Sequence, residues 1–286
     1  MPAQNVTEQE SRAQTPYLVL VPTAPLLRLN LRELWDFREL LFFLAWRDIK
    51  VRYRQTVLGI AWAIIQPLTA MVIFSIVFGQ LAKLPSDGIP YPIFTYVALL
   101  PWNFFAGSLS RGTTSLVSNA GLISKVYFPR AIIPLSAMLS ALVDFFFSFL
   151  ILIGMMIWYG IVPTWRLLML PLLLLLALAT ALGFGLWFSA LNVRYRDVNY
   201  IIPFLIQIWM YVSPVAYSSS LVPEQWQGVY ALNPMVGVIE GFRWALLGTA
   251  WQYSGFVLLS VLVVLVALVS GMIYFHRMEE TFADVV

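Results

Sequence analysis

Long stretches without charged residues recur along the chain and alternate with short polar segments. A helix needs about 20 apolar residues to cross a hydrocarbon core of about 30 Å. Several stretches approach or exceed this length, and Asp144 is the one charge inside them. We therefore predict six transmembrane helices, at Val57–Leu81, Ile93–Ser110, Ala131–Tyr159, Leu167–Leu191, Tyr200–Tyr217 and Ser254–Phe275.

The composition agrees with a membrane protein. Hydrophobic residues make up 60% of the 286 positions, charged residues 11%, and the mean hydropathy is +0.82. A soluble domain carries about 25% charged residues. A bilayer can solvate so much apolar surface, and a helix satisfies its own backbone groups there. The expected fold class is an all-α polytopic membrane protein.

The distribution of Lys and Arg predicts the orientation. With the N-terminus inside, six spans return the C-terminus to the same side. Only Lys83, Arg166 and Arg243 then lie outside, which leaves 14 of the 17 Lys and Arg residues inside. Cytoplasmic segments of membrane proteins carry this excess. We expect a multi-pass protein of the cytoplasmic (inner) membrane, with both termini in the cytoplasm.

The segment between Tyr217 and Ser254 does not fit a seventh span. Its apolar run, Val229–Gly248, is amphipathic and is broken by Asn233-Pro234. Irregular backbone at membrane depth needs cover by protein or water. We predict a pair of short re-entrant helices that dip into one face of the membrane before the last span.

An amphipathic helix is predicted at residues 31–55, before the first span. Its polar positions lie on one helical stripe. They are Asp36, Glu39, Arg47, Lys50 and Arg54, and Leu34, Leu41, Ala45 and Ile49 fall opposite. The pattern is typical of a helix in the membrane surface. It serves either as an anchor or also as a docking site for a partner. Residues 1–30 are expected to form a cytoplasmic tail, with a short strand at Tyr17–Val21, and residues 56–286 the transmembrane domain.

Several kinds of chemistry are missing. There is no cysteine and a single histidine, so thiolate or histidine metal sites are not expected. None of the three lysines follows a glycine, so the chain has no ATP-binding phosphate loop. The cytoplasmic acids do not cluster as a metal-dependent transferase requires. We predict no enzyme activity, cofactor or metal on this chain, and the net charge of +3 suggests no nucleic-acid partner.

Asp144 is an acidic residue inside a predicted span, flanked by three phenylalanines. Such a residue is a candidate for proton or ion coupling. The alternative, which we favour, is a protonated or hydrogen-bonded structural residue that faces another helix.

Two predicted cytoplasmic loops combine cations with apolar side chains. In the loop at residues 111–130, we expect four such side chains to be exposed and to plug into another protein. They are Leu122, Ile123, Tyr127 and Phe128. The loop at residues 192–198 holds Arg194, Tyr195 and Arg196. The other interpretation is that these cations only anchor the spans.

Small residues recur every four positions in the fourth predicted span. They are Ala177, Ala181 and Gly185, and in parallel Ala179 and Gly183. Such spacing lets helix backbones approach closely. It serves packing within the chain or contact with a second copy.

Three segments resemble one known family. They are Leu44–Gly59 with the following Gln66-Pro67, Ile123–Pro134, and Asn192–Val198. In this order they resemble the membrane subunit of a type-2 ABC exporter, in its polysaccharide branch. That branch exports O-antigen, capsule and teichoic-acid chains. The resemblance extends from about Leu31 to the C-terminus.

The resemblance implies a homodimer that binds two copies of a separate cytoplasmic ATP-binding subunit. ATP and Mg would be held by that subunit. The amphipathic helix and the cytoplasmic loops would form its docking site. The residues implied are Arg47, Lys50, Arg54, Asn119, Leu122, Lys125, Tyr127, Phe128, Arg194 and Arg196.

The implied substrate is a polysaccharide attached to a polyprenyl diphosphate, with membrane lipid around it. Arg52 and Arg54 would meet the diphosphate, or else anionic lipid, and Glu240 and Arg243 would belong to a periplasmic gate. Aromatic rings suit a sliding glycan because they stack on sugar faces, although aromatics also anchor spans and fill cores. The conduit candidates are Trp62, Phe74, Phe78, Trp102, Phe104, Phe105, Trp209 and Tyr217.

The leading hypothesis is therefore the membrane subunit of an ATP-driven polysaccharide exporter. A type-2 exporter of drugs or lipids, an ion-coupled flippase and a membrane glycan-modifying enzyme remain the alternatives.

Overall fold

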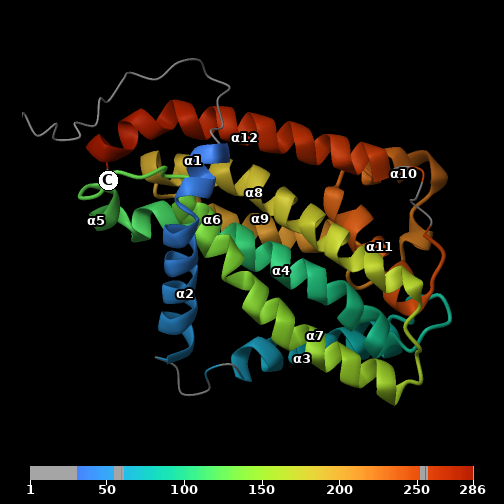
Figure 1. Ribbon diagram of the computed structural model, residues 1–286. Helices are drawn as coiled ribbons and strands as arrows, with labels where there is room; N and C mark the ends of the chain where they lie inside the picture. Colours follow the sequence, from blue (N-terminus) through green and yellow to red (C-terminus); the bar gives the residue numbers. More distant parts are fainter. Residues whose placement is uncertain (1–30, 55–58, 60, 252–254, 256, 286) are drawn as a thin grey trace, which may run out of the picture.

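The computed structural model describes residues 31–54, 59, 61–251, 255 and 257–285. Within these ranges the regular structure is entirely helical (Figure 1). The predicted all-α fold is therefore confirmed for this part of the chain. The predicted N-terminal tail, with its strand at Tyr17–Val21, lies outside the described residues.

Within the described residues, five helical segments are long and apolar enough to cross a membrane. Figure 1 shows them packed into one bundle. The first is Ala61–Leu81, which consists of α3 (Ala61–Phe74) and the π-helix η1 (Ser75–Leu81), and the second is α4 (Tyr91–Ser118). The third is Ile132–Trp158, made of α6 (Ile132–Leu139) and α7 (Ala141–Trp158), and the fourth is Trp165–Arg194, made of η2 (Trp165–Met169) and α8 (Leu170–Arg194). The fifth is Val257–Glu279, which lies within α12 (Val257–Val285).

The helix in the fifth predicted span is shorter than the others. α9 runs from Val198 to Val212, 15 residues, where a span Tyr200–Tyr217 was predicted. At 1.5 Å per residue it is about 22 Å long. It ends there because Ser213 precedes Pro214 and adopts an extended conformation, as residues before proline prefer.

Two short helices occupy the segment predicted to be re-entrant. They are α10 (Glu224–Tyr230) and α11 (Pro234–Leu247). Asn233 separates them, and its side-chain oxygen accepts a hydrogen bond from the Met235 amide (3.1 Å), which caps α11. Proline at the first helical position also favours this start. α11 packs against α4 and α8 and is buried over most of its length.

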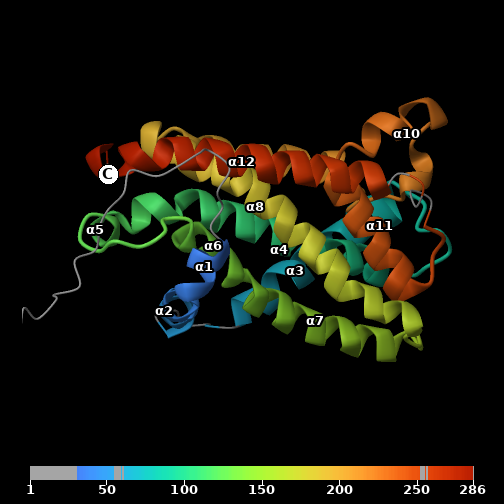
Figure 2. The same ribbon diagram turned by 45° about the horizontal axis from the view of Figure 1, so that its top comes forward.

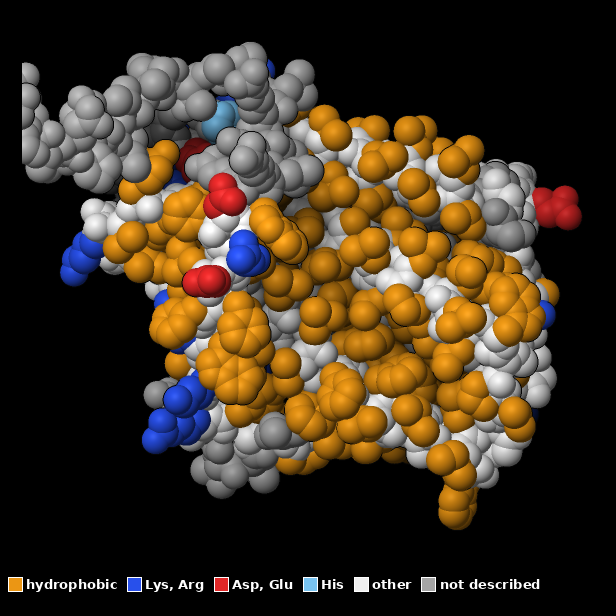
Figure 3. Space-filling model, viewed as in Figure 1, with side chains coloured by type: hydrophobic (Ala, Val, Ile, Leu, Met, Phe, Trp, Pro, Cys, Tyr) orange, Lys and Arg blue, Asp and Glu red, His pale blue; other side chains and the backbone are white. Residues whose placement is uncertain are grey.

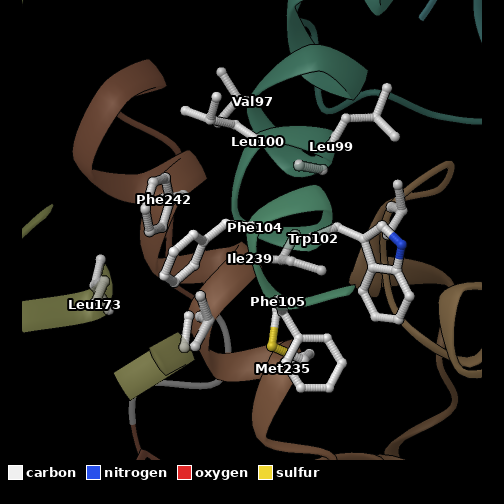
Figure 4. Packing of buried hydrophobic residues seen from close by; sticks show 14 of the residues in the cluster. Val97, Leu99, Leu100, Trp102, Phe104, Phe105, Leu173, Met235, Ile239 and Phe242 are labelled. Carbon is white, nitrogen blue, oxygen red and sulfur yellow. The ribbon is translucent and has the colours of Figure 1, made fainter. Parts of the chain in front are cut away.

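α4 forms the centre of the bundle. Its apolar side chains are buried against α7, α8 and α11, and Figure 4 shows part of this core. Phe104 and Phe105 come from α4, Phe242 from α11 and Leu173 from α8. α4 is therefore the helix against which the other helices of the bundle pack.

A second, smaller core lies at the end of the bundle that carries α2 (Arg38–Arg54) and the C-terminal part of α12. It joins Leu44 of α2, Phe128 and Ile132 near the start of α6, and Phe275 and Phe282 of α12. α1 (Leu31–Asp36) precedes α2, so the predicted helix at 31–55 is interrupted at Phe37. Figures 1 and 2 show α2 crossing the ends of the long helices rather than running along them.

The lateral surface is strongly apolar. Figure 3 shows hydrophobic side chains covering most of one face, with charged side chains gathered mainly at the α1–α2 end. Soluble monomers rarely expose apolar patches of this extent. The arrangement fits a bundle whose sides are solvated by lipid.

The predicted close packing of the fourth span is confirmed, and it occurs within the chain. A Cβ atom at Gly183 would lie 2.9 Å from backbone atoms of Ala267 and Leu268 in α12, and one at Gly271 would lie 2.4 Å from the Gly183 carbonyl oxygen. Gly185 is likewise in contact with Met138 of α6. Glycine is required where α8 and α12 cross.

Gly271→Ala is expected to destabilise the protein by about 1–3 kcal/mol, because the added methyl group forces two backbones apart. Thermal unfolding in detergent measures the effect. Gly154→Ala in α7 is the matched control, since a Cβ there meets no atom within 4 Å. Equal melting temperatures for the two variants would contradict the assigned role of Gly271.

Candidate docking, conduit and gate sites

The outward face of α1 and α2 is aromatic. Trp35, Phe42, Phe43 and Trp46 are all more than half exposed. The opposite face packs on the second core through Leu44, helped by partly buried leucines that include the predicted Leu34 and Leu41. Such a face, with Lys50 and Arg54 exposed near its end, suits the boundary between lipid and water.

One hydrogen bond joins α2 to the end of α4. Arg47 Nη2 donates to Asn119 Oδ1 at 2.7 Å and also contacts Asp48 Oδ1 at 2.8 Å. Asn119 in turn donates to the Ser115 carbonyl. Two of the predicted docking residues, 72 positions apart, are therefore neighbours in the structure.

The loop after α5 (Ala120–Ile123) differs from the prediction. Ile123 and Phe128 were expected to be exposed, but they are 7% and 4% exposed. That expectation is wrong because both side chains fill the second core. Leu122 is partly buried. Lys125, Val126 and Tyr127 project outward between these anchors, with Tyr127 71% exposed.

A third exposed element, the turn between α8 and α9, contains Arg194, Tyr195 and Arg196. All three are exposed, and the Arg194 guanidinium lies 5.3 Å from the centre of the Tyr195 ring. Figure 1 places this turn at the same end of the bundle as α2 and α5. The predicted docking residues thus share one end of the molecule, except that Phe128 faces inward.

Asp144 is not an isolated acid. Its carboxylate forms ion pairs with Arg111 of α4 and with Arg52 of α2 (3.2 Å), and it accepts a hydrogen bond from the Tyr53 hydroxyl. Asp144 is therefore hydrogen-bonded and faces other helices, as the favoured prediction expected, and the choice between a structural and a functional role stays open. Burial raises the pKa of the Tyr53 phenol, and the hydrogen bond to Asp144 raises it further, so Tyr53 remains the donor.

A buried ion pair lies at the opposite end. Arg243 Nη1 is 3.1 Å from Glu240 Oε1, and both side chains are buried. The guanidinium also donates to the carbonyls of Tyr217 and Val215 (3.3 Å each) and lies 3.7 Å from the centre of the Phe94 ring. Arg243 thereby ties α11 to α4 and to the segment after α9.

The loop between η1 and α4 closes the same end. The Asp87 carboxylate accepts hydrogen bonds from Ser218 (2.6 Å) and Ser220 (3.4 Å) in the segment after α9. Hydrogen bonds and the ion pair therefore hold the η1–α4 loop, the segment after α9 and α11 together.

The predicted conduit aromatics divide into two groups. Trp102, Phe104 and Phe105 belong to the hydrophobic core and have no exposed face, so core packing accounts for them. Trp209 is held between Phe105 and Phe184 (ring centres 4.9 and 5.0 Å away) and donates to Asn233 (2.8 Å).

The second group lies on the surface or beside it. Trp62 is more than half exposed on α3. Phe74, Phe78 and Tyr217 line a cavity of about 70 Å³, together with Met210 and Tyr211 of α9. The α3–η1 segment and α9 are therefore neighbours at this point.

Sequence reasoning missed three aromatic residues on α9. Tyr200, Phe204 and Tyr211 are all more than half exposed. Their spacing of four and seven residues places them on one helical face. That spacing was available in the sequence and could have identified them.

The comparisons with known proteins agree with this architecture. The family model described as "ABC-2 type transporter" matches residues 39–247. The chain therefore belongs to the ABC-2 type transporter family. It is a multi-pass membrane protein and a transport subunit of that family.

Curated relatives cover most of the chain. The O-antigen export system permease protein RfbA of Myxococcus xanthus is 31% identical over 215 residues, 74% of this chain and 82% of the relative. The protein of that name from Klebsiella pneumoniae is 28% identical over 260 residues, 91% of this chain and 98% of the relative. The polysialic acid transport protein KpsM of Escherichia coli is 25% identical and covers 70% of this chain and 78% of the relative.

Proposed function

We propose that the chain is the membrane-spanning subunit of an ATP-driven exporter that moves a polyprenyl-diphosphate-linked polysaccharide across the cytoplasmic membrane. The observation that carries this proposal is the similarity to O-antigen export permeases over 91% of this chain and 98% of the relative. Similarity to a polysialic acid transport protein supports the same class of substrate.

The proposed topology has six crossings. α9, with the segment that follows it, forms the fifth crossing and α12 the sixth, and α10 and α11 dip into the outer face of the membrane. The end that carries α2, α5 and the C-terminal part of α12 is placed in the cytoplasm, in accord with the excess of Lys and Arg on that side. Residues 1–30 form the tail, 31–55 the interface helix and 56–286 the transmembrane domain.

The energy comes from a partner. The chain has no phosphate loop of its own, so each of its two copies binds one ATP-binding subunit, which holds ATP and Mg. The proposed docking surface is defined as α2, the Arg47–Asn119 contact, the exposed Lys125–Tyr127 loop and the Arg194–Arg196 turn. Exposed aromatic and cationic side chains are typical anchors of such interfaces.

The conduit for the glycan is proposed along the neighbouring faces of α3, η1 and α9. Trp62, Phe74, Phe78 and Tyr217 contribute from the predicted set, and the exposed aromatics of α9 extend it. Flat rings stack on the apolar faces of sugars without holding any one sugar tightly. Arg52 and Arg54 near the cytoplasmic side meet the diphosphate of the lipid carrier.

The outer end carries the gate. Glu240 and Arg243 form its closed contact with the segment after α9, and the Asp87–serine contacts reinforce it. Opening requires these contacts to separate or to move as one unit with α11.

Deletion of the chain tests the proposed function. We expect long lipid-linked glycan to accumulate on the cytoplasmic side of the inner membrane, and surface polysaccharide to be lost. Isolation of lipid-linked glycans with side-specific labelling measures both. Complementation by the intact chain is the control, and it should fail when the partner subunit cannot hydrolyse ATP.

The alternatives give different outcomes. Normal surface polysaccharide in the deletion strain contradicts the proposal and favours an exporter of drugs or other lipids. Export that persists without ATP hydrolysis and stops when the proton gradient collapses favours an ion-coupled flippase.

A further inference from the structure

The charge cluster around Asp144 joins three separate elements. Arg52 and Tyr53 belong to α2, Arg111 to α4 and Asp144 to α7. Arg111 also donates to Ser140, just before α7, at 3.1 Å. Arg52 and Tyr53 thereby bond α2 to Asp144 of α7.

The Asp144 carboxylate is shared between two cations. Two guanidinium groups share one carboxylate oxygen, Oδ2, while Oδ1 accepts from Tyr53. The pair with Arg111 is the closer of the two ion pairs. Because both cations share this one carboxylate, Asp144 can leave one of them and remain paired with the other.

Arg52 is the member of the cluster that an incoming anion can reach. Its side chain is 46% exposed, against 22% for Arg111 and 20% for Asp144. Its Nη1 lies 3.2 Å from the Asp144 carboxylate, a direct ion pair in which the Arg52 side stays accessible to a competing anion. An anion that approaches along the α2 surface also meets the exposed Lys50 and Arg54, one turn of helix or less from Arg52.

We propose that Asp144 is an internal substitute for the diphosphate of the lipid-linked substrate, and that the arriving diphosphate displaces it from Arg52. Asp144 then stays paired with Arg111, so no charge is left buried without a partner. The exchange breaks the ion pair that binds α2 to α7. This inference rests on the proposed function, because it adds substrate sensing to the predicted diphosphate site.

The consequence concerns α2. This helix also carries Arg47, which bonds Asn119 in the proposed docking surface. When the diphosphate binds Arg52, the ion pair between Arg52 and Asp144 is lost, and α2 is attached to α7 by one contact fewer. This change occurs in the helix that is proposed to bind the ATP-binding subunit. Arrival of substrate is thereby communicated to the partner.

The test is equilibrium binding of a polyprenyl diphosphate to the full-length chain in complex with its ATP-binding subunit, in lipid nanodiscs. Asp144→Asn removes the competing carboxylate and is expected to tighten binding about fivefold, the effect of losing one partly exposed ion pair. A residue that merely supports the fold would weaken binding when replaced. Asp36→Asn, at an exposed carboxylate of α1, is the matched control and leaves the affinity unchanged.

A second variant protects the test against misfolding. Asp144→Asn leaves Arg111 without its anion, whereas Arg111→Gln combined with Asp144→Asn removes both members of the buried pair and keeps Arg52. The double variant is also expected to bind the diphosphate about fivefold more tightly. Arg52→Gln is expected to bind it more weakly in either background.

The probes separate the sources of the anion. Polyprenyl diphosphate is compared with inorganic diphosphate and with nanodiscs rich in phosphatidylglycerol. Tighter binding of the lipid-linked diphosphate supports the inference, whereas an equal gain for phosphatidylglycerol alone overturns it. Unchanged or weaker binding by both Asp144 variants also overturns it. If the unaltered complex binds no polyprenyl diphosphate, both this inference and the proposed lipid-linked substrate are wrong. The deletion strain then tests separately whether the chain exports polysaccharide at all.

Discussion

Replacement of Arg243 by Gln is expected to lower the stability of the protein by about 3–5 kcal/mol. The change leaves the Glu240 carboxylate buried without its cation, and it also removes the donors to the Tyr217 and Val215 carbonyls. Removing one member of a buried ion pair is strongly destabilising because the remaining charge is left buried without a partner. Replacing both members by apolar residues changes the stability much less. The fraction of folded, monodisperse protein after heating in detergent measures the loss.

The double variant Glu240→Leu/Arg243→Met distinguishes stability from gating. Both charges are gone, so most of the lost stability is expected to return, because apolar residues of similar volume replace a buried pair at little cost. Export is expected to leak or stall, since the proposed closed contact is absent. A double variant as unstable as Arg243→Gln would show that the ion pair itself holds the outer end together.

Replacement of Tyr127 by Ala is expected to reduce the affinity for the ATP-binding subunit about 30-fold, the effect of about 2 kcal/mol. Tyr127 is the largest exposed side chain of the loop held by Ile123 and Phe128, and exposed tyrosines frequently dominate interfaces. Binding of the cognate ATP-binding subunit to the purified chain measures the change. The melting temperature should stay constant, because Tyr127 belongs to neither hydrophobic core.

Two neighbouring variants sharpen this result. Tyr127→Phe keeps the ring and is expected to retain most of the affinity. Phe128→Ala should instead lower the melting temperature, because it empties part of the second core, and removal of a buried Phe costs about 3–5 kcal/mol. If Tyr127→Ala bound the subunit normally, the loop would not belong to the docking surface.

The helical type and the positions of the long apolar helices could be predicted because their signal is local, whereas the predicted count of six compares with five such helices in the described residues. Five of the predicted spans match long apolar helices within a few residues, although α4 extends to Ser118, beyond the predicted end at Ser110. The end of α9 at Val212 could also have been predicted, because the sequence Ser213-Pro214 disfavours continuation of the helix. The break at Phe37 has no signal of this kind, and the continuous stripe of polar residues suggested a single helix.

The environment of the candidate residues was harder to predict, because it depends on contacts between distant segments. Tyr53 and Asp144 are 91 positions apart, so the sequence showed an isolated acid where the fold forms a cluster. The composition of the loop likewise did not reveal that Phe128 and Phe282 belong to one hydrophobic core. Exposure is decided by such contacts, and aromatic residues of the core and of the surface look alike in a sequence.

α4 connects the two ends of the molecule physically. Its 28 residues span about 42 Å as one continuous helix. Near its first turn Phe94 lies under the Arg243 guanidinium, and toward its other end Arg111 pairs with Asp144 and Asn119 bonds Arg47. A tilt or an axial shift of α4 changes the geometry at both ends of the bundle in the same motion. The proposed opening of one end and the proposed grip on the other are therefore linked mechanically through α4, without any relay of side chains through the middle of the membrane.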